Sequence, residues 1–223
     1  MTRGLPPGTR ERVKTAKRRS AGSTRWLQRQ LDDPYVRRAK AEGYRSRAAY
    51  KLIELDERFG LLKGARRIVD LGIAPGGWSQ VVRQRLPASI VVGIDLLPVD
   101  PIDGVAILLL DFMDDSAPAA LREALGGPAD LVLSDMAANT VGHPQTDHLR
   151  TMGLVEAAVA FAVEVLRPGG AFVAKVLAGG ADNDLVAELK RNFAQVKHAK
   201  PPASRKGSSE WYVVATGRKS ADG

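Results

Sequence analysis

From Arg66 onward, short apolar runs alternate with stretches of helical character, and this alternation constrains the fold more than any other feature. The candidate strands are IVDLG, SIVVGID, VAILLLD, ADLVLSD, GGAFVAKVL and EWYVVATG. Continuous apolar runs separated by helices are typical of parallel strands that are buried on both faces. The sequence therefore predicts an α/β fold with a doubly wound, mostly parallel sheet and helices on both of its faces.

The segments between these strands complete the predicted core. The expected helices span Trp78–Leu86, Ala117–Leu125, His148–Leu166 and Asp184–Phe193. Gln195–Lys200 is a further candidate strand. It would pair with the last strand across the polar loop PPASRKGSS, and the sheet would then have seven strands.

The first 60 residues differ from this core. Residues 1–22 combine proline, glycine and clustered Arg and Lys with too few apolar side chains to fold, so we expect a flexible arm. Ser23–Leu31 and Asp33–Ala41 are predicted as short helices, each of which opens on a residue suited to N-capping. Ser46–Phe59 is predicted as a longer helix with one apolar face, which would carry Lys51 to the edge of the core.

We therefore expect a basic flexible arm over residues 1–22 and a single domain over 23–219. Within that domain, residues 23–60 form a short basic helical extension and residues 61–219 form the core. No internal repeat is visible, and 223 residues are too few for two independent domains of ordinary size.

The positive charge is concentrated at the beginning of the chain. The net charge is +8, yet residues 1–50 contain 14 Lys or Arg against 4 Asp or Glu, so the remaining 173 residues sum to −2. A basic segment attached to a near-neutral core is suited to a polyanion, whose phosphates it neutralises. For residues 1–20 alone, a solubilising tail is an equally good interpretation.

Several classes of protein are disfavoured by composition. No apolar run is long enough to cross a bilayer, and the basic first residues lead into no apolar segment of a secretory signal. The chain has no cysteine, and its three histidines (His143, His148 and His198) lack ligand spacing, so we expect no metal site. We expect a cytoplasmic protein without a membrane partner, and a monomer because no extended apolar face is left over.

Residues 70–78, DLGIAPGGW, join the first predicted strand of the core to the helix that follows. Ligands bind at this position in open α/β sheets. Gly72 and Gly76 allow a ligand to approach the backbone, but such loops serve NAD, FAD and S-adenosylmethionine, and glycines also suit a tight turn without a ligand. The spacing does not match Gly-X-Gly-X-X-Gly, and Pro75 stiffens the loop, which argues against a pyrophosphate site.

Four aspartates, Asp70, Asp95, Asp111 and Asp135, are expected at the carboxyl ends of successive strands. Like charges at one edge of a sheet are unfavourable unless they bind ligands or cations. Asp95 follows Gly72 by 23 positions, where a carboxylate accepts hydrogen bonds from both ribose hydroxyls of a cofactor. Asp111 is placed to accept one from an adenine amino group, although helix capping explains it equally well.

Two lysines and two acids are candidates for the chemistry. Lys175 interrupts an apolar strand, where a buried ammonium requires a carboxylate nearby. Asp135 ends the neighbouring strand, Lys51 arrives from the N-terminal helix, and Glu210 begins the last strand, so all four would meet beside the cofactor loop. Taken singly, each of them is also explained by an ordinary salt bridge.

Taken together, these motifs resemble those of the FtsJ/RrmJ family of ribosomal RNA large-subunit uridine 2'-O-methyltransferases. The likeness runs in order from about Ser23 to Lys219 through SRAAYKL, DLGIAPGGWSQ, DLLPVDPI, DFMDD, SDMAAN, RPGGAFVAKV and SSEWYVVATGRK. Several fixed segments in order are far more specific than one loop. The resemblance implies a Rossmann-like methyltransferase fold, S-adenosyl-L-methionine as cofactor, and ribosomal RNA or the large ribosomal subunit as partner.

The resemblance also implies roles for individual residues. The family's Lys-Asp-Lys-Glu tetrad at the methyl-transfer site matches Lys51, Asp135, Lys175 and Glu210. Its cofactor contacts match positions at the glycine loop and the strand ends, namely Gly72, Gly76, Trp78, Asp95, Asp111 and Asp135.

The sequence differs from the family's usual motifs at two positions. Ala138 stands where the family has proline after Asp-Met-Ala, which should loosen the turn after Asp135. Ile73 replaces a small residue and should alter the packing under the glycine loop. Neither departure removes a reacting group.

These residues suggest a mechanism and an RNA surface. Lys175 would orient and deprotonate the ribose hydroxyl, Asp135 would aim its amine, and Lys51 with Glu210 would balance charge and hold the ribose. The acids favour the charged ammonium, so the sequence leaves open whether Lys175 is a base or only a positioning cation. RNA phosphates would contact the segment 25–47 and the loop 200–209.

Three other functions remain open at this stage. A dinucleotide oxidoreductase shares the topology, but the glycine spacing and the basic N-terminal segment do not fit it. A non-catalytic ribosome-assembly factor would not need all four tetrad positions. A 2'-O-methyltransferase that acts on transfer RNA shares the core, and only the resemblance favours ribosomal RNA.

Overall fold

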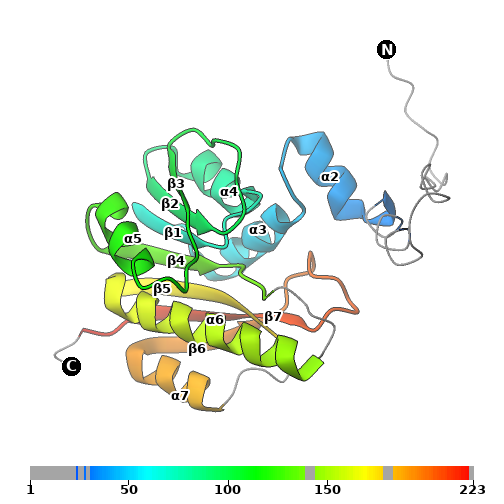
Figure 1. Ribbon diagram of the computed structural model, residues 1–223. Helices are drawn as coiled ribbons and strands as arrows, with labels where there is room; N and C mark the ends of the chain where they lie inside the picture. The colour runs from blue at the N-terminus through cyan, green and yellow to red at the C-terminus, as the bar shows by residue number, and fades with distance from the viewer. Residues whose placement is uncertain (1–23, 25–27, 29–30, 139–143, 178–182, 221–223) are drawn as a thin grey trace.

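One seven-stranded sheet organises the part of the chain that the computed structural model describes, which comprises residues 24, 28, 31–138, 144–177 and 183–220. The strand order is β3-β2-β1-β4-β5-β7-β6 (Figure 1). The α/β fold with a mostly parallel sheet is therefore confirmed. The predicted arm over residues 1–22, and most of the predicted helix Ser23–Leu31, lie outside the described residues.

Five parallel strands are followed by an antiparallel pair. The parallel strands are β1 (Arg67–Leu71), β2 (Ile90–Asp95), β3 (Val105–Leu109), β4 (Ala129–Ser134) and β5 (Leu166–Leu177). β7 (Glu210–Arg218) runs antiparallel between β5 and β6 (Phe193–Ala199), which confirms the predicted terminal pair. Because β5 and β7 are antiparallel, the end of β5 and the start of β7 meet at the same edge of the sheet.

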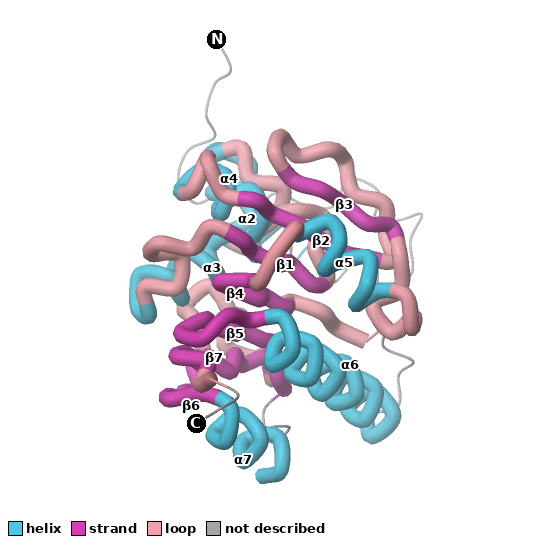
Figure 2. The backbone as a smooth tube through the Cα atoms, turned by 90° about the vertical axis from the view of Figure 1, so that its left-hand side faces the viewer, coloured by secondary structure: helices cyan, strands magenta, loops and turns pink. Residues whose placement is uncertain are grey.

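Helices cover both faces of the sheet (Figure 2). On one face lie α3 (Ala48–Phe59) and α4 (Gly77–Arg85), and on the other lie α5 (Ala117–Leu125), α6 (Pro144–Val165) and α7 (Asn183–Asn192). The short helix α2 (Pro34–Glu42) packs beside α3 rather than on the sheet.

The helix ends follow local chemistry. Asp33 is the N-cap of α2, and its carboxylate accepts a hydrogen bond from the backbone N–H of Tyr35, as expected from its position. α6 begins at Pro144 instead of the predicted His148, because proline is well suited to the first turn of a helix. α3 begins at Ala48, two residues after the predicted start, because Ser46 and Arg47 form a turn before it.

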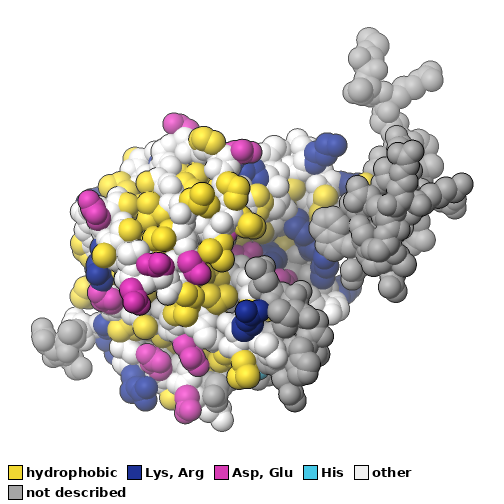
Figure 3. All heavy atoms as spheres, viewed as in Figure 1, with side chains coloured by type: hydrophobic (Ala, Val, Ile, Leu, Met, Phe, Trp, Pro, Cys, Tyr) yellow, Lys and Arg dark blue, Asp and Glu magenta, His cyan; other side chains and the backbone are white. Residues whose placement is uncertain are grey.

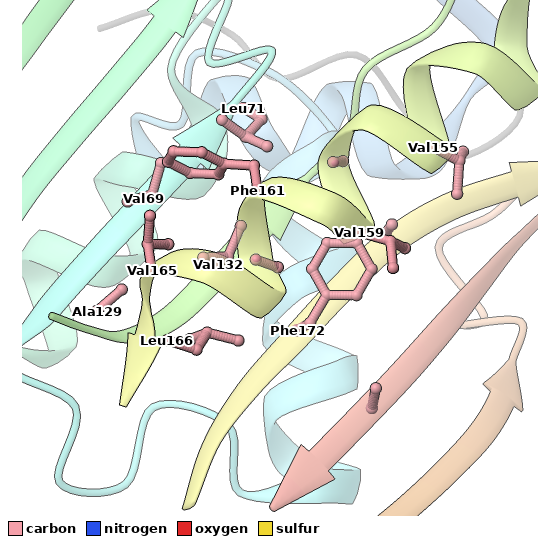
Figure 4. Close-up of a cluster of buried hydrophobic side chains, with 14 of the residues drawn as sticks. Val69, Leu71, Ala129, Val132, Val155, Val159, Phe161, Val165, Leu166 and Phe172 are labelled. Carbon is pink, nitrogen blue, oxygen red and sulfur yellow. The ribbon is translucent and has the colours of Figure 1, made fainter. Parts of the chain in front are cut away.

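The central strands are buried on both faces, which explains their unbroken apolar sequences. Phe172 of β5, Phe161 of α6 and Val132 of β4 belong to the core on the α5–α7 side (Figure 4). Ile68 of β1 and Leu131 of β4 belong to the core on the α3–α4 side. Each such side chain contributes roughly 1.5–3 kcal/mol when it is removed from water.

Ile73 and Gly93 are packed against each other beneath the glycine loop. Ile73 is buried, and a Cβ atom placed on Gly93 in β2 would lie 2.3 Å from the Cδ1 atom of Ile73 and 2.9 Å from its Cβ atom. The space above Gly93 is therefore filled by Ile73. The larger residue expected to alter this packing is accommodated because β2 has a glycine opposite it.

We predict that Gly93→Ala lowers the free energy of unfolding by about 1–3 kcal/mol, because the added methyl group overpacks this contact. In an Ile73→Ala background the same change should cost much less, since the neighbouring side chain is gone. Urea unfolding of both single variants and the double variant measures this coupling.

Gly153→Ala in α6 is the matched control, because a Cβ atom there meets nothing within 4 Å. It should be neutral or stabilising. Equal costs of Gly93→Ala in both backgrounds would contradict the proposed contact.

Candidate active site

The candidate site lies at the carboxyl edge of the sheet, in the crevice between β1 and β4. The chain crosses to opposite sides of β1 when it forms β2 and then β4, and ligands bind in α/β sheets at such a reversal. The loop 72–77 leaves β1 at this point. Asp135 follows β4 there, and its backbone N–H donates to the carbonyl oxygen of Leu71 at 3.2 Å.

Two glycines of this loop occupy positions that no other residue fits. Gly72 has a φ of +76°, and an added Cβ atom would lie 2.8 Å from the Cγ atom of Met136. Gly76 has a φ of +107°, and an added Cβ atom would lie 2.5 Å from the Cδ1 atom of Ile102. Backbone conformation and packing within the protein therefore already explain why both positions are glycine. They also let α4 begin with no side-chain cap, which leaves first-turn N–H groups available to a ligand.

Asp70, the penultimate residue of β1, is held by the protein. Its side chain is buried, and its carboxylate accepts a hydrogen bond of 2.7 Å from the hydroxyl of Ser79 in α4. Burial raises the pKa of Asp70 to about 7; the bond from Ser79 opposes this shift, and the charges of Asp135 and Asp95 add to it. Asp70 thus joins β1 to α4 beneath the loop instead of facing a ligand.

Asp95 and Asp111 stand at the rim of the crevice. The two carboxylate oxygens of Asp95 accept from the backbone N–H groups of Ala74 at 2.8 Å and Leu97 at 2.9 Å, so Asp95 braces the glycine loop. Asp111 was expected at the end of β3, but it follows the last residue of that strand by two positions. Its carboxylate accepts from the N–H of Met113 at 2.9 Å in a local turn.

The side chain of Trp78 points into the core and does not face the crevice where a ligand would bind. Its side chain is buried, its indole N–H donates to the carbonyl oxygen of Ala48 at 2.8 Å, and its ring packs against Tyr212. Trp78 therefore anchors the start of α3 to α4. Only its backbone, in the first turn of α4, is left to approach a ligand.

The four residues of the predicted tetrad converge in space. The Nζ atom of Lys175 lies 3.2 Å from Oδ1 of Asp135, and its ammonium also donates to the backbone carbonyl of Asp135. The Nζ atom of Lys51 lies 3.7 Å from the same Oδ1 atom and 3.4 Å from Oε2 of Glu210. Both lysines are buried. Two ammonium groups and two carboxylates thus form one connected cluster.

Strand register explains this convergence. Lys175 of β5 is paired with Tyr212 of β7, and Leu177 is paired with Glu210. Because alternate residues of a strand point to the same face, Glu210 and Tyr212 share one face of the sheet. Lys51 reaches that face from α3.

Tyr212 is part of the cluster and was missed by the sequence analysis. Its hydroxyl donates to Oδ1 of Asp135 at 2.7 Å. Burial raises the pKa of Tyr212 well above its usual value, and the neighbouring charge of Asp135 adds to the shift. Its spacing of two residues from Glu210 was the only signal available.

Asp135 is the centre of this charge cluster. Burial alone would raise its pKa, but the ammonium groups of Lys175 and Lys51, together with the hydrogen bonds from Tyr212 and Lys175, outweigh burial and lower the pKa. Asp135 is therefore a carboxylate at neutral pH. Together with Glu210 it compensates the two lysine charges, and its contacts fix the position of the Lys175 side chain.

A cleft of about 710 Å³ opens beside the cluster, between α2, the start of α3 and the loop before β7. Arg45 is prominent in its wall. The guanidinium of Arg45 donates to the carbonyl oxygens of Pro75 at 3.3 Å, Asp100 at 2.6 Å and Pro101 at 2.7 Å. It therefore ties the N-terminal extension to the glycine loop, another contact that the sequence did not reveal.

Within the described ranges, no group of three or more His, Asp or Glu side chains is arranged to hold a metal ion. Among the helices in those same ranges, none combines the length and apolar character that a bilayer crossing requires.

Comparisons with known proteins agree with this geometry. Residues 44–218 match the FtsJ-like methyltransferase family. The chain is 76% identical to the Ribosomal RNA large subunit methyltransferase E of Rhizorhabdus wittichii, over 95% of this chain and 93% of that protein. It is 75% identical to the protein of the same name from Novosphingobium aromaticivorans, over 94% of both chains.

A solved structure shares the fold. The crystal structure of a protein from Plasmodium falciparum, described as a ribosomal RNA methyltransferase, superimposes with a TM-score of 0.70 at 34% identity. The match covers 78% of this chain and 98% of that one.

We predict that the buried Asp70 makes stability fall with rising pH. Its pKa of about 7 in the folded state exceeds the value of about 3.9 expected when unfolded, so the folded chain retains a proton that the unfolded chain releases. The stabilising effect is complete below about pH 4 and is lost as pH rises through 7. From pH 5 to 8, Asp70→Asn should gain about 2 kcal/mol relative to the unmodified chain in urea unfolding.

Asp115→Asn, an exposed change in the loop before α5, is the control and should give a pH profile parallel to that of the unmodified chain. A parallel profile for Asp70→Asn as well would show that Asp70 does not hold the proton.

Proposed function

This chain belongs to the FtsJ-like methyltransferase family, and we propose that it methylates the ribose 2'-hydroxyl of a uridine in large-subunit ribosomal RNA. The relatives named Ribosomal RNA large subunit methyltransferase E match it over nearly their whole length, which supports this substrate. The observation that carries the proposal is the cluster of Lys51, Asp135, Lys175 and Glu210 beside the glycine loop. The family match and these relatives confirm the family expected from the sequence.

S-adenosylmethionine is the cofactor that we propose for the crevice. When bound, it supplies a methyl group that its sulfonium charge has already activated. Three exposed apolar side chains stand near Asp95 and Asp111, with exposed fractions of 60% for Leu96, 63% for Leu97 and 53% for Met113. Apolar surface beside a carboxylate suits a purine ring and its ribose.

The residues at the rim then have defined roles in the proposal. Asp95 accepts hydrogen bonds from the ribose hydroxyls of the cofactor, and Asp111 accepts one from its adenine amino group. Gly72 and Gly76 let the backbone come close, and the first-turn N–H groups of α4, that of Trp78 included, are directed at its carboxylate. Asp135 lies between this site and the cleft.

In the proposed reaction, Lys175 orients the substrate hydroxyl and receives its proton. The ammonium of Lys175 first gives up a proton to solvent; the hydroxyl proton becomes acidic as the new oxygen–carbon bond forms, and it passes to the resulting amine. The contacts of Lys175 with the carboxylate and the carbonyl of Asp135 hold its amine in place. Tyr212 in turn holds the carboxylate, so much of the rate comes from positioning.

Lys51 and Glu210 complete the charge balance. Lys51 lies between the two carboxylates, and Glu210 is the more exposed of the two, with a side-chain exposure of 30% against 18% for Asp135. We assign to this pair the task of holding the substrate ribose. The cleft beside them is lined by Lys40, Arg45, Arg47 and Arg205, whose positive charge suits the phosphates of RNA.

We predict that Lys175→Met lowers the single-turnover rate of methyl transfer by about 10²- to 10⁴-fold at saturating cofactor, because the proton acceptor is removed. The measurement uses labelled S-adenosylmethionine with purified large ribosomal subunits, free ribosomal RNA and transfer RNA, followed by mapping of the modified ribose. Lys190→Met, an exposed change on α7, should leave the rate unchanged.

The same assay separates the remaining functions. Label on transfer RNA alone would show a different substrate. Cofactor binding without label on any RNA would favour an assembly factor. A near-normal rate for Lys175→Met would remove Lys175 from the mechanism.

We predict that Asp95→Asn weakens S-adenosylmethionine binding by about 10- to 100-fold, because a charged acceptor that also braces the glycine loop is lost. Calorimetric titration measures the dissociation constant. The control, Asp103→Asn, changes an exposed residue of the loop between β2 and β3 and should bind normally. Unchanged affinity of Asp95→Asn would exclude the proposed cofactor position.

A further inference from the structure

One buried carboxylate, that of Asp33, joins three segments that are far apart in sequence. Its Oδ1 atom caps α2 through the N–H of Tyr35 at 3.0 Å. Its Oδ2 atom lies 2.6 Å from Nη1 of Arg47, in the turn before α3, and 3.3 Å from Nε of Arg205, in the loop between β6 and β7. Asp33 is only 8% exposed, so little water weakens these contacts.

The two arginines are bound to Asp33 by only part of each guanidinium. Nε of Arg47 and Nη2 of Arg205 are buried and have no hydrogen-bond partner in the part of the chain that the structure describes. The hydroxyl of Ser208 is likewise buried and has no hydrogen-bond partner among the described residues. Arg47, Arg205 and Ser208 all line the cleft beside Lys51 and Glu210. A buried N–H without a partner is costly, so these donors indicate a ligand.

The charge of this group indicates an anion. Two guanidinium groups share the single carboxylate of Asp33, so these three side chains together carry a net charge of +1. Lys and Arg side chains also gather on this side of the molecule, where α2 and α3 lie (Figure 3). Guanidinium groups match the oxygens of a phosphate with paired donors.

The loop that carries Arg205 is fixed separately from its guanidinium. Glu54 of α3 accepts from the N–H of Ala203 at 2.7 Å and from the hydroxyl of Tyr35 at 3.0 Å. Arg47 also donates to the carbonyl oxygen of Ala203. The loop backbone therefore keeps these ties when the charge of Asp33 is removed. What Asp33 adds is the orientation of the two guanidinium groups.

We propose that Asp33 is a positioning residue that pre-orients Arg47 and Arg205 to bind one backbone phosphate of the RNA, adjacent to the methylated nucleotide. The inference rests on the proposed function, because it takes the cleft to be the RNA site. It adds a residue that touches neither RNA nor cofactor and acts through two that touch RNA.

The test compares Asp33→Asn with Asp32→Asn. Asparagine keeps an N-cap oxygen and removes the charge. Asp32 is the exposed neighbour, and its carboxylate accepts a hydrogen bond from the side chain of Gln28. For Asp33→Asn we expect roughly tenfold weaker binding of large-subunit ribosomal RNA, since a charge-assisted phosphate contact is lost. S-adenosylmethionine affinity and the rate at saturating RNA should be unchanged.

A salt titration separates positioning from simple loss of structure. Loss of one phosphate contact lowers the slope of log affinity against log salt by about 0.7–0.9, which partial unfolding would not do selectively. Asp33→Glu should restore part of the affinity. Arg205→Met should reproduce the Asp33→Asn defect, and adding Asp33→Asn to it should cost little more.

RNA binding is measured apart from methyl transfer, so the two proposals fail separately. If the unmodified chain binds RNA but transfers no methyl group, the proposed function fails and the Asp33 comparison still stands. If Asp33→Asn binds RNA with unchanged affinity and slope while the unmodified chain is active, the role of Asp33 is wrong. Equal losses of RNA and cofactor binding, or no RNA binding by the unmodified chain, would also overturn it.

Discussion

Asp135 follows β4 where the sheet order reverses, and its carboxylate is shared by Lys51, Lys175 and Tyr212. These groups come from α3, β5 and β7, so a single anion joins the N-terminal extension to the centre of the sheet and to its antiparallel end. The arrangement is mutually dependent, because two buried ammonium groups are tolerable only with the carboxylate, and the carboxylate stays ionised only with them. These contacts hold the side chains of the cluster relative to one another within the protein itself.

A second set of contacts, at the periphery, repeats this principle. Arg45 binds three carbonyl oxygens of loops at the carboxyl edge of the sheet, and Asp33 binds Arg47 and Arg205, which also line the cleft. The described part of the N-terminal extension, from residue 31 onward, is thus attached to the core by specific charge-assisted bonds. This explains how a segment outside the sheet forms one wall of the cleft, beside the cluster of Lys51, Asp135 and Glu210.

Packing under the glycine loop shows how the fold absorbs a departure from the family pattern. Ile73 is larger than the small residue that the family resemblance predicts after Gly72, and its side chain packs against Gly93 of the neighbouring strand. The loop above it retains its hydrogen bonds from Ala74 to Asp95 and from Ile73 to the carbonyl oxygen of Ile94. A change of volume is thereby confined to the core and leaves the polar positions of the rim in place.

The sequence by itself determined the strands, most helix boundaries and the glycine loop, because apolar periodicity, N-capping and glycine requirements are local properties. Through the family resemblance it also indicated Lys51, Asp135, Lys175 and Glu210. Tertiary structure alone decided which partners these residues meet. The bond between Tyr212 and Asp135 joins residues 77 positions apart, and that between Arg205 and Asp33 spans 172. No local pattern encodes such pairs, since they arise only when strand register and helix packing bring distant segments together. The orientation of the Trp78 side chain has the same cause. It points into the core because α3 packs over it, and the sequence does not show which face α3 covers.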